Sequence, residues 1–65
     1  MWIETEDRKY INSVAIEQIS IFSDGFVFRV KAYGITDAEY ILAKYSDYDT
    51  ARAFLNALIK RLNNG

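Results

Sequence analysis

The most regular pattern of apolar and polar positions lies at the C-terminal end of the chain. Its apolar residues recur at intervals of three and four, which is the spacing of one face of an amphipathic helix. They are Ala51, Phe54, Leu55, Leu58, Ile59 and Leu62. Ser46 followed by Asp49 resembles a capping box, and Asp47 is an equally suitable N-cap one residue later. The pattern therefore predicts a helix over residues 47–62.

Two short strands are predicted at the N-terminal end. Residues 2–5 and 9–12 carry apolar side chains on either side of the polar residues Glu6, Asp7 and Arg8. A polar interruption between two short apolar segments is typical of a hairpin turn. We therefore expect the first two strands to pair with each other.

A second hairpin is predicted in the middle of the chain. Along residues 14–22 the alternation of apolar positions changes parity near Glu17, which predicts a bulge or a turn there. Residues 23–25 read Ser-Asp-Gly, a turn in which glycine supplies the positive φ that hairpin loops need. This turn separates a strand over residues 19–22 from one over residues 26–33.

The strand over residues 26–33 predicts which of its faces is buried. Its even positions are apolar throughout: Phe26, Phe28, Val30 and Ala32. We expect these side chains to face inward, with Arg29 and Lys31 facing outward. Val27 and Tyr33 then add apolar area to the outward face.

A further turn at residues 34–38 leads to the last predicted strand, residues 39–45, whose inward face the pattern leaves open. Its apolar residues are almost consecutive, so two arrangements are possible. The side chains facing away from the helix are either Tyr40 and Leu42 or Ile41, Ala43 and Tyr45. Both choices leave apolar area on a second face of the sheet.

Together these elements predict an α+β fold, a curled antiparallel β-meander of about five short strands with one C-terminal amphipathic helix packed on one face. The 65 residues leave room for a single domain, residues 1–65. The chain is 51% hydrophobic and holds one tryptophan, five tyrosines and four phenylalanines. This composition excludes a disordered chain, which would be poor in apolar residues.

The missing residue types restrict how so small a domain is stabilised. Cysteine, histidine and proline are all absent, which excludes disulfides and the usual zinc and haem sites. Small domains otherwise depend on oligomerisation, so we expect a homodimer. The lack of cysteine also fits a reducing compartment, so we expect a cytoplasmic protein.

The termini and apolar stretches predict neither export nor membrane insertion. The apolar start Met1-Trp2-Ile3 is interrupted at once by acidic residues, unlike a signal peptide. No apolar stretch approaches the length of about 20 residues that crosses a bilayer. We therefore expect no membrane partner.

No arrangement of side chains predicts an enzyme. The serines and threonines lie in turn or cap contexts, where bonding to the backbone explains them. The acid pairs Glu4/Glu6 and Asp47/Asp49 flank a turn and a helix start, where solvation and the helix dipole account for them. We predict no catalytic, cofactor-binding or metal-binding residues, no cofactor and no small-molecule substrate.

The predicted function is that of a non-enzymatic protein-interaction module, either self-associating or binding another protein. Apolar side chains left on the sheet faces favour this reading. The candidate interaction surface consists of Phe22, Val27, Tyr33, Arg29, Lys31 and Lys44. Trp2 is a possible anchor of such a surface, and it is equally well explained as a lid over the core.

The alternative function is binding of single-stranded nucleic acid through the outward sheet face. Tyr33 could stack an unpaired base while Arg29, Lys31 and Lys44 hold phosphate. Eight basic and nine acidic residues give a formal net charge of −1, which lacks the electrostatic footprint of a duplex DNA binder.

Several segments together resemble a family of small stand-alone proteins of Gram-positive bacteria and their phages. They are Met1-Trp2-Ile3-x-Thr5-x-Asp7, Ile11-Asn12, Ile41-Leu42-Ala43-x-Tyr45 and Ala51-x-x-Phe54-Leu55. Ala43 stands where that family usually has glycine, and Tyr48-Asp49-Thr50 replaces a Glu-rich helix start. The resemblance covers nearly the whole chain and implies a β-meander with a C-terminal helix, and a cytoplasmic protein of bacterial or mobile-element origin. It implies no activity.

Overall fold

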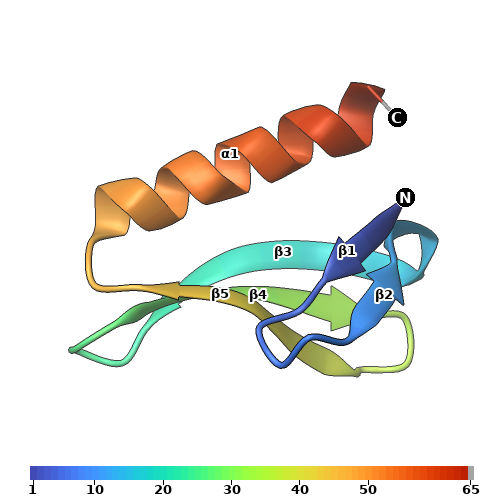
Figure 1. Cartoon of the computed structure of the whole chain (residues 1–65). Coiled ribbons are helices and arrows are strands. Elements are labelled where there is room, and N and C mark those ends of the chain that lie inside the picture. The colour runs from blue at the N-terminus through green and yellow to red at the C-terminus, as the bar shows by residue number, and fades with distance from the viewer. Residues whose placement is uncertain (65) are drawn as a thin grey trace.

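Five strands divide between two antiparallel sheets in the computed structural model, which describes residues 1–64 (Figure 1). β1 (Trp2–Glu4) pairs with β2 (Tyr10–Asn12), and the larger sheet has the order β3 (Ile16–Ser23), β4 (Phe28–Gly34), β5 (Glu39–Tyr45). A 3-10 turn, η1 (Ser13–Ala15), links the sheets, and α1 (Tyr48–Asn64) follows β5. The helix lies across one face of the larger sheet, so the predicted α+β meander is confirmed.

The small sheet is held against the free side of β5. The backbone N–H of Glu6, in the turn between β1 and β2, donates to the carbonyl oxygen of Ile41 at 2.8 Å. The Glu6 carboxylate also lies 3.1 Å from Nζ of Lys44. The turn between β1 and β2 thereby covers part of the β5 edge of the larger sheet.

Thr5 organises the turn between β1 and β2 that the sequence predicts. Its hydroxyl accepts from the backbone N–H of Lys9 at 3.1 Å and bonds the carboxylate of Asp7. This bond is the main cause that lowers the pKa of Asp7. Arg8 takes a positive φ of 65°, which closes the turn. Thr5 is buried, and these bonds satisfy its hydroxyl.

The hairpin of β3 and β4 confirms the predicted bulge and corrects the position of Phe26. The register shifts between Ile16 and Gln18, where the alternation changes parity. Strand pairing ends at Ser23 opposite Phe28, so β4 begins two residues later than expected. Phe26 is 89% exposed at the tip of the loop, and the prediction that it faces inward was wrong.

Side-chain bonds within the loop explain why β4 starts late. Oδ1 of Asp24 accepts from the backbone N–H groups of Phe26 and Val27, each at 3.0 Å. The Ser23 hydroxyl accepts from the N–H of Gly25, whose φ is +97°. Backbone groups that would have extended the strand pairing are satisfied locally, as is typical of Asp and Ser in turns.

A second bulge resolves the question of which face of β5 is buried. The register with β4 shifts between the pairs made by Val30 and Lys31, and Leu42 is the extra residue. Tyr40 on one side of this bulge and Tyr45 on the other both pack against the core. An even-numbered residue faces the core before the bulge and an odd-numbered one after it, because the extra residue reverses the alternation. Neither of the two predicted arrangements therefore holds along the whole strand.

The core lies between the larger sheet, α1 and β1. Its buried apolar residues are Ile3, Val30, Ala32, Leu42, Ala51, Leu55 and Leu58. Asp47 caps the helix, since its carboxylate accepts from the N–H and the hydroxyl of Thr50, both at 2.8 Å. The helix confirms the predicted apolar face and ends at Asn64, two residues beyond the expected end. Ile59, at the margin of that face, is 41% exposed.

Candidate interaction surface

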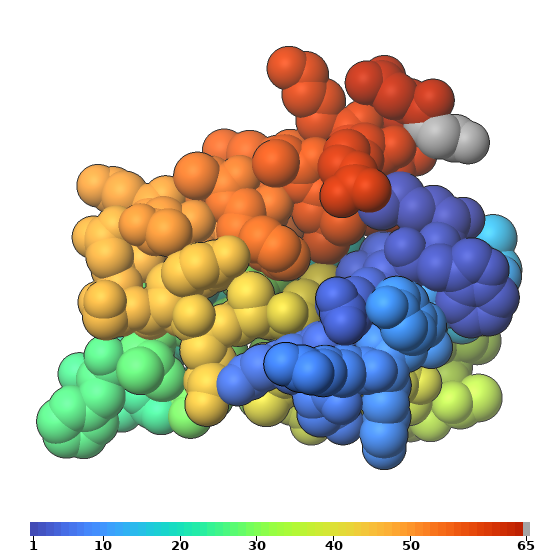
Figure 2. Space-filling view, in the orientation of Figure 1, coloured from blue at the N-terminus to red at the C-terminus, as the bar shows by residue number. Residues whose placement is uncertain are grey.

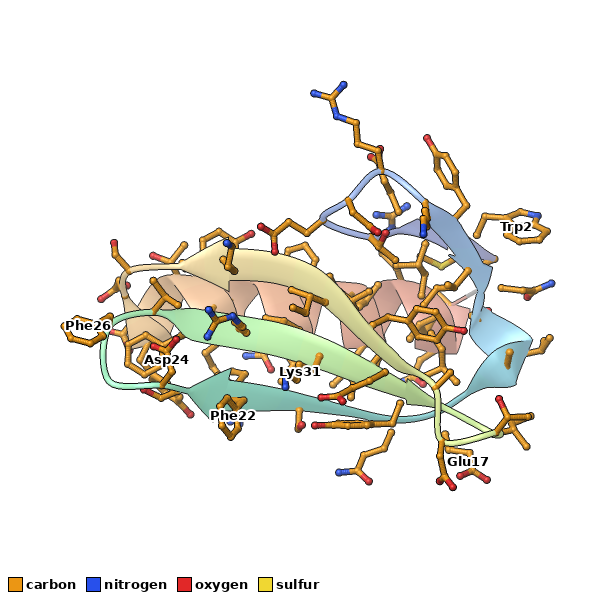
Figure 3. All side chains as sticks on the ribbon, turned by 90° about the horizontal axis from the view of Figure 1, so that it is seen from below. Trp2, Glu17, Phe22, Asp24, Phe26 and Lys31 are labelled. Atoms are coloured by element: carbon orange, nitrogen blue, oxygen red, sulfur yellow. The ribbon has the colours of Figure 1, made fainter. Side chains whose placement is uncertain are left out.

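Five of the six residues predicted to form an interaction surface share one face of the larger sheet. They are Phe22, Arg29, Lys31, Tyr33 and Lys44. Phe22 pairs with Arg29 across β3 and β4, and Arg29 pairs with Lys44 across β4 and β5. Directly opposed residues of antiparallel strands lie on the same face of a sheet. This face points away from α1, because the alternate residues of β4, Val30 and Ala32, are buried in the core. This surface, named the outer face below, is the one turned to the viewer in Figure 3.

Val27, the sixth predicted residue, lies in the β3–β4 loop and not on the outer face. It is half-buried, and its carbonyl oxygen accepts from the N–H of Asp24 at 3.3 Å. The loop bonds of Asp24 hold it outside β4. Its predicted place beside Arg29 on the strand was therefore wrong.

Each cation of the outer face is paired with an acid. The pairs are Arg29 with Asp24, Lys31 with Glu39 at 2.7 Å, and Lys44 with Glu6 at 3.1 Å. The hydrogen bond from Arg29 is the main cause that holds the pKa of Asp24 well below its usual range. The hydrogen bond to Glu39 raises the pKa of Lys31. The three cations are thus neutralised by the protein's own carboxylates.

Lys31 makes a second contact on this face, with an aromatic ring. Its Nζ lies 4.7 Å from the centre of the Phe22 ring, within the range of a cation–π interaction. The Lys31 side chain is largely covered, whereas Phe22 is 50% exposed. The Phe22 ring is therefore an exposed apolar surface on β3 that Lys31 covers only in part.

Two apolar residues whose exposure the sequence pattern did not predict flank β3. Phe26 follows the strand and Val14, which is 77% exposed, precedes it in η1. They are the two most exposed large apolar side chains of residues 1–64. Figure 2 shows the β3–β4 loop, in green, projecting from the body of the molecule. The Ser-Asp-Gly turn was the sequence signal for this projection, but it was placed too early to include Phe26.

The outer edge of β3 has no neighbouring strand in the part of the chain that the structure describes. The larger sheet begins with β3, and Figure 3 shows no ribbon beyond it. We refer to the outward row of β3 backbone groups, together with Val14, Phe22 and Phe26, as the β3 edge. A row of unpaired N–H and C=O groups is a template for pairing with another strand.

Trp2 lies apart from the outer face and from the β3 edge. It borders an open groove of about 530 Å³ between the small sheet, β5 and the C-terminal half of α1. The groove wall includes Tyr10, Phe54 and Arg61. Figure 3 places Trp2 and Phe26 at opposite ends of the molecule. Trp2 and Phe26 therefore belong to two separate apolar surfaces.

Two observations concern the acidic and the buried polar side chains of residues 1–64. Among residues 1–64 no three acidic side chains gather in a way that could hold a metal ion. The buried side-chain oxygens and nitrogens of the same residues all have hydrogen-bond partners. No helix of residues 1–64 combines the length and the apolar character needed to cross a membrane.

No protein-family model, curated protein or solved structure matched this chain in the comparisons made. The resemblance to small proteins of Gram-positive bacteria and their phages stays a prediction.

Proposed function

We propose that this protein is a non-enzymatic protein-interaction module that self-associates, with the homodimer as its working form. The observation that carries the proposal is the β3 edge, where Phe26, Val14 and Phe22 are 89%, 77% and 50% exposed. Exposed large apolar side chains on and at both ends of one edge strand favour an interaction site. Burying them against a partner removes that area from water.

The size of the core supports the same proposal. Val30, at 0% exposure, is the largest side chain of residues 1–64 that is completely buried. A domain of about 60 residues buries only about 60% of the surface of its unfolded chain, and is correspondingly marginal. With no cysteine available for a disulfide, association is the remaining way to enlarge the buried apolar area.

Sedimentation and light scattering over micromolar concentrations test the proposal. We expect a mass near twice the 7.5 kDa of the chain, and a shift towards dimer as concentration rises. Phe26→Ser should weaken the dimer, while Trp2→Ser, on the separate groove, should leave it unchanged. A monomer at every concentration would contradict self-association. A dimer weakened only by Trp2→Ser would move the interface to the groove.

Single-stranded nucleic acid is the second candidate ligand, for the outer face. The shared face of Tyr33, Arg29 and Lys31 supports it, because aromatics and cations together can hold a single strand. The pairing of each cation with an acid weakens it, because phosphate would have to displace a carboxylate. Oligonucleotide binding at low salt that falls with added salt and with Tyr33→Ala would favour this candidate. We expect no such binding.

We also propose a cytoplasmic location. The supporting observation is the complete lack of cysteine, which fits a reducing compartment. Fractionation of cells producing a tagged chain would test it, since recovery outside the cytoplasm would contradict the proposal.

A further inference from the structure

We propose that two copies of this chain pair antiparallel through their β3 edges around a two-fold axis at Ser20, which joins two three-stranded sheets into one six-stranded sheet. The inference rests on the proposed self-association and names the surface and geometry by which it occurs.

The two edge strands of the larger sheet differ in whether another part of the chain covers them. The β5 edge is covered in part by the small sheet, through the bond from Glu6 N–H to the Ile41 carbonyl. The β3 edge lacks three of the devices that usually prevent strand addition, namely lysine, proline and short length. β3 is eight residues long, the longest strand of the described chain, and its one charged residue, Glu17, lies at the bulge near its start.

Symmetry restricts the register of such a pairing to those centred on a residue of β3. Two identical antiparallel strands related by a two-fold axis perpendicular to the sheet must oppose residues that lie on the same face. Centring the axis on Ser20 places Ile19 opposite Ile21 on the helix side, and Phe22 opposite Gln18 on the outer face. This register uses the regular part of β3 beyond the bulge, and it opposes no two like charges.

The flanking apolar residues make the β3 edge complementary to itself. Val14 and Phe26 each lie six positions from Ser20, on opposite sides. An antiparallel pair centred on Ser20 therefore brings Val14 of one copy and Phe26 of the other to the same end of the interface, and does so at both ends. A strand of unrelated sequence would not offer this match, so the geometry points to a second copy.

The area that a stable interface buries also requires contacts from the residues at the two ends of β3. Stable interfaces bury about 800 Å² on each partner, and pairing of a few backbone residues alone covers less than that. Exposed rings and branched side chains at both ends, together with Phe22, extend the contact beyond the paired backbone. The most exposed apolar residues of the chain thus lie where the extra area is needed.

A charge reversal at the proposed axis tests the register. Ser20 meets its own copy on the axis, so Ser20→Glu opposes two carboxylates and Ser20→Lys opposes two ammonium groups. Within each monomer Ser20 lies opposite Lys31, so the Glu variant has a favourable neighbour and should stay folded. We expect Ser20→Glu alone to weaken the dimer by about tenfold or more, equivalent to about 1.4 kcal/mol.

Mixing the two variants is the decisive measurement. Ser20→Glu and Ser20→Lys together should form a heterodimer more tightly than either forms with itself. Asn56→Glu, on the exposed side of α1, makes the same charge change away from the β3 edge and should dimerise like the unmodified chain. Circular dichroism of each variant confirms that it is folded before its mass is compared.

The outcomes separate this inference from the proposed function. If the chain dimerises and neither Ser20→Glu nor the mixture changes the dimer, the β3 pairing is overturned and self-association stands. If the unmodified chain is monomeric at every concentration, both are overturned. Amide hydrogen exchange gives an independent check, because β3 amides should become more protected with rising concentration, whereas β2 amides should not.

Discussion

The ammonium group of Lys31 lies 4.7 Å above the ring of Phe22 and 2.7 Å from a carboxylate oxygen of Glu39. One side chain thus links the outer faces of all three strands of the larger sheet, because Phe22 is on β3, Lys31 on β4 and Glu39 on β5. The contact with Phe22 has a direct test. In a double-mutant cycle, Phe22→Leu should destabilise the unmodified chain more than it destabilises Lys31→Gln. Equal effects in urea unfolding would show that the ring and the ammonium group are not coupled.

Two neighbouring positions on the apolar face of α1 should differ in their effect on stability. Leu55 is 8% exposed within the core and Ile59 is 41% exposed at its margin. We expect Leu55→Ala to lower the free energy of unfolding by about 3 kcal/mol, and Ile59→Ala by about 1 kcal/mol. Urea unfolding at one fixed protein concentration compares them. Equal losses would mean that the core extends to the margin of the helix.

The capping of α1 distinguishes two residues that the sequence left equivalent. The Asp47 carboxylate accepts both the N–H and the hydroxyl of Thr50. Asp47→Ala should therefore lower the Tm by several degrees, while Ser46→Ala should change it little. Thermal unfolding followed by circular dichroism gives both values. A larger loss of Tm with Ser46→Ala than with Asp47→Ala would show that Ser46, and not Asp47, caps the helix.

The Asp24–Arg29 pair should make stability depend on acid pH. Its hydrogen bonds lower the pKa of Asp24 in the folded chain below the unfolded value. The resulting stabilisation is present above about pH 4 and is lost as the pH falls through the folded pKa. Asp24→Asn should therefore be less stable than the unmodified chain at neutral pH, with the difference shrinking in acid. Arg29→Gln should also be less stable than the unmodified chain at neutral pH, and this difference in the free energy of unfolding should likewise shrink in acid. If the differences do not change with pH, the Asp24–Arg29 pair is not their cause.

Local patterns explain what the sequence could predict. The helix from Tyr48 follows from apolar spacing and a cap, and the bulge near Glu17 follows from a parity change within one strand. Both signals arise from neighbouring residues, so they do not depend on the rest of the fold. The strand boundary at Phe26 was missed because Asp24 and Ser23 bond the loop backbone, and a run of apolar residues does not reveal those bonds.

Contacts between distant segments account for most of what the sequence could not predict. The pairing of Lys44 with Glu6 depends on how the small sheet packs on β5, and nothing in either segment specifies this. The bulge at Leu42 was equally hidden, because in a nearly continuous apolar run an extra residue breaks no pattern. Among the candidate site residues, Arg29, Lys31 and Tyr33 lie on the outward face of β4 where the alternation predicted them, and Val27, in the loop, does not.

The covering of the β5 edge by the small sheet also bears on how far assembly can proceed. If two copies pair through their β3 edges as proposed, only the partly covered β5 edges remain, which would hinder growth beyond two copies. If residues 1–12 were removed, the sheet would carry two open edges, and each added copy would present a new one. The N-terminal hairpin, held by Glu6 on Ile41, would then be what separates a closed pair from an open-ended fibre.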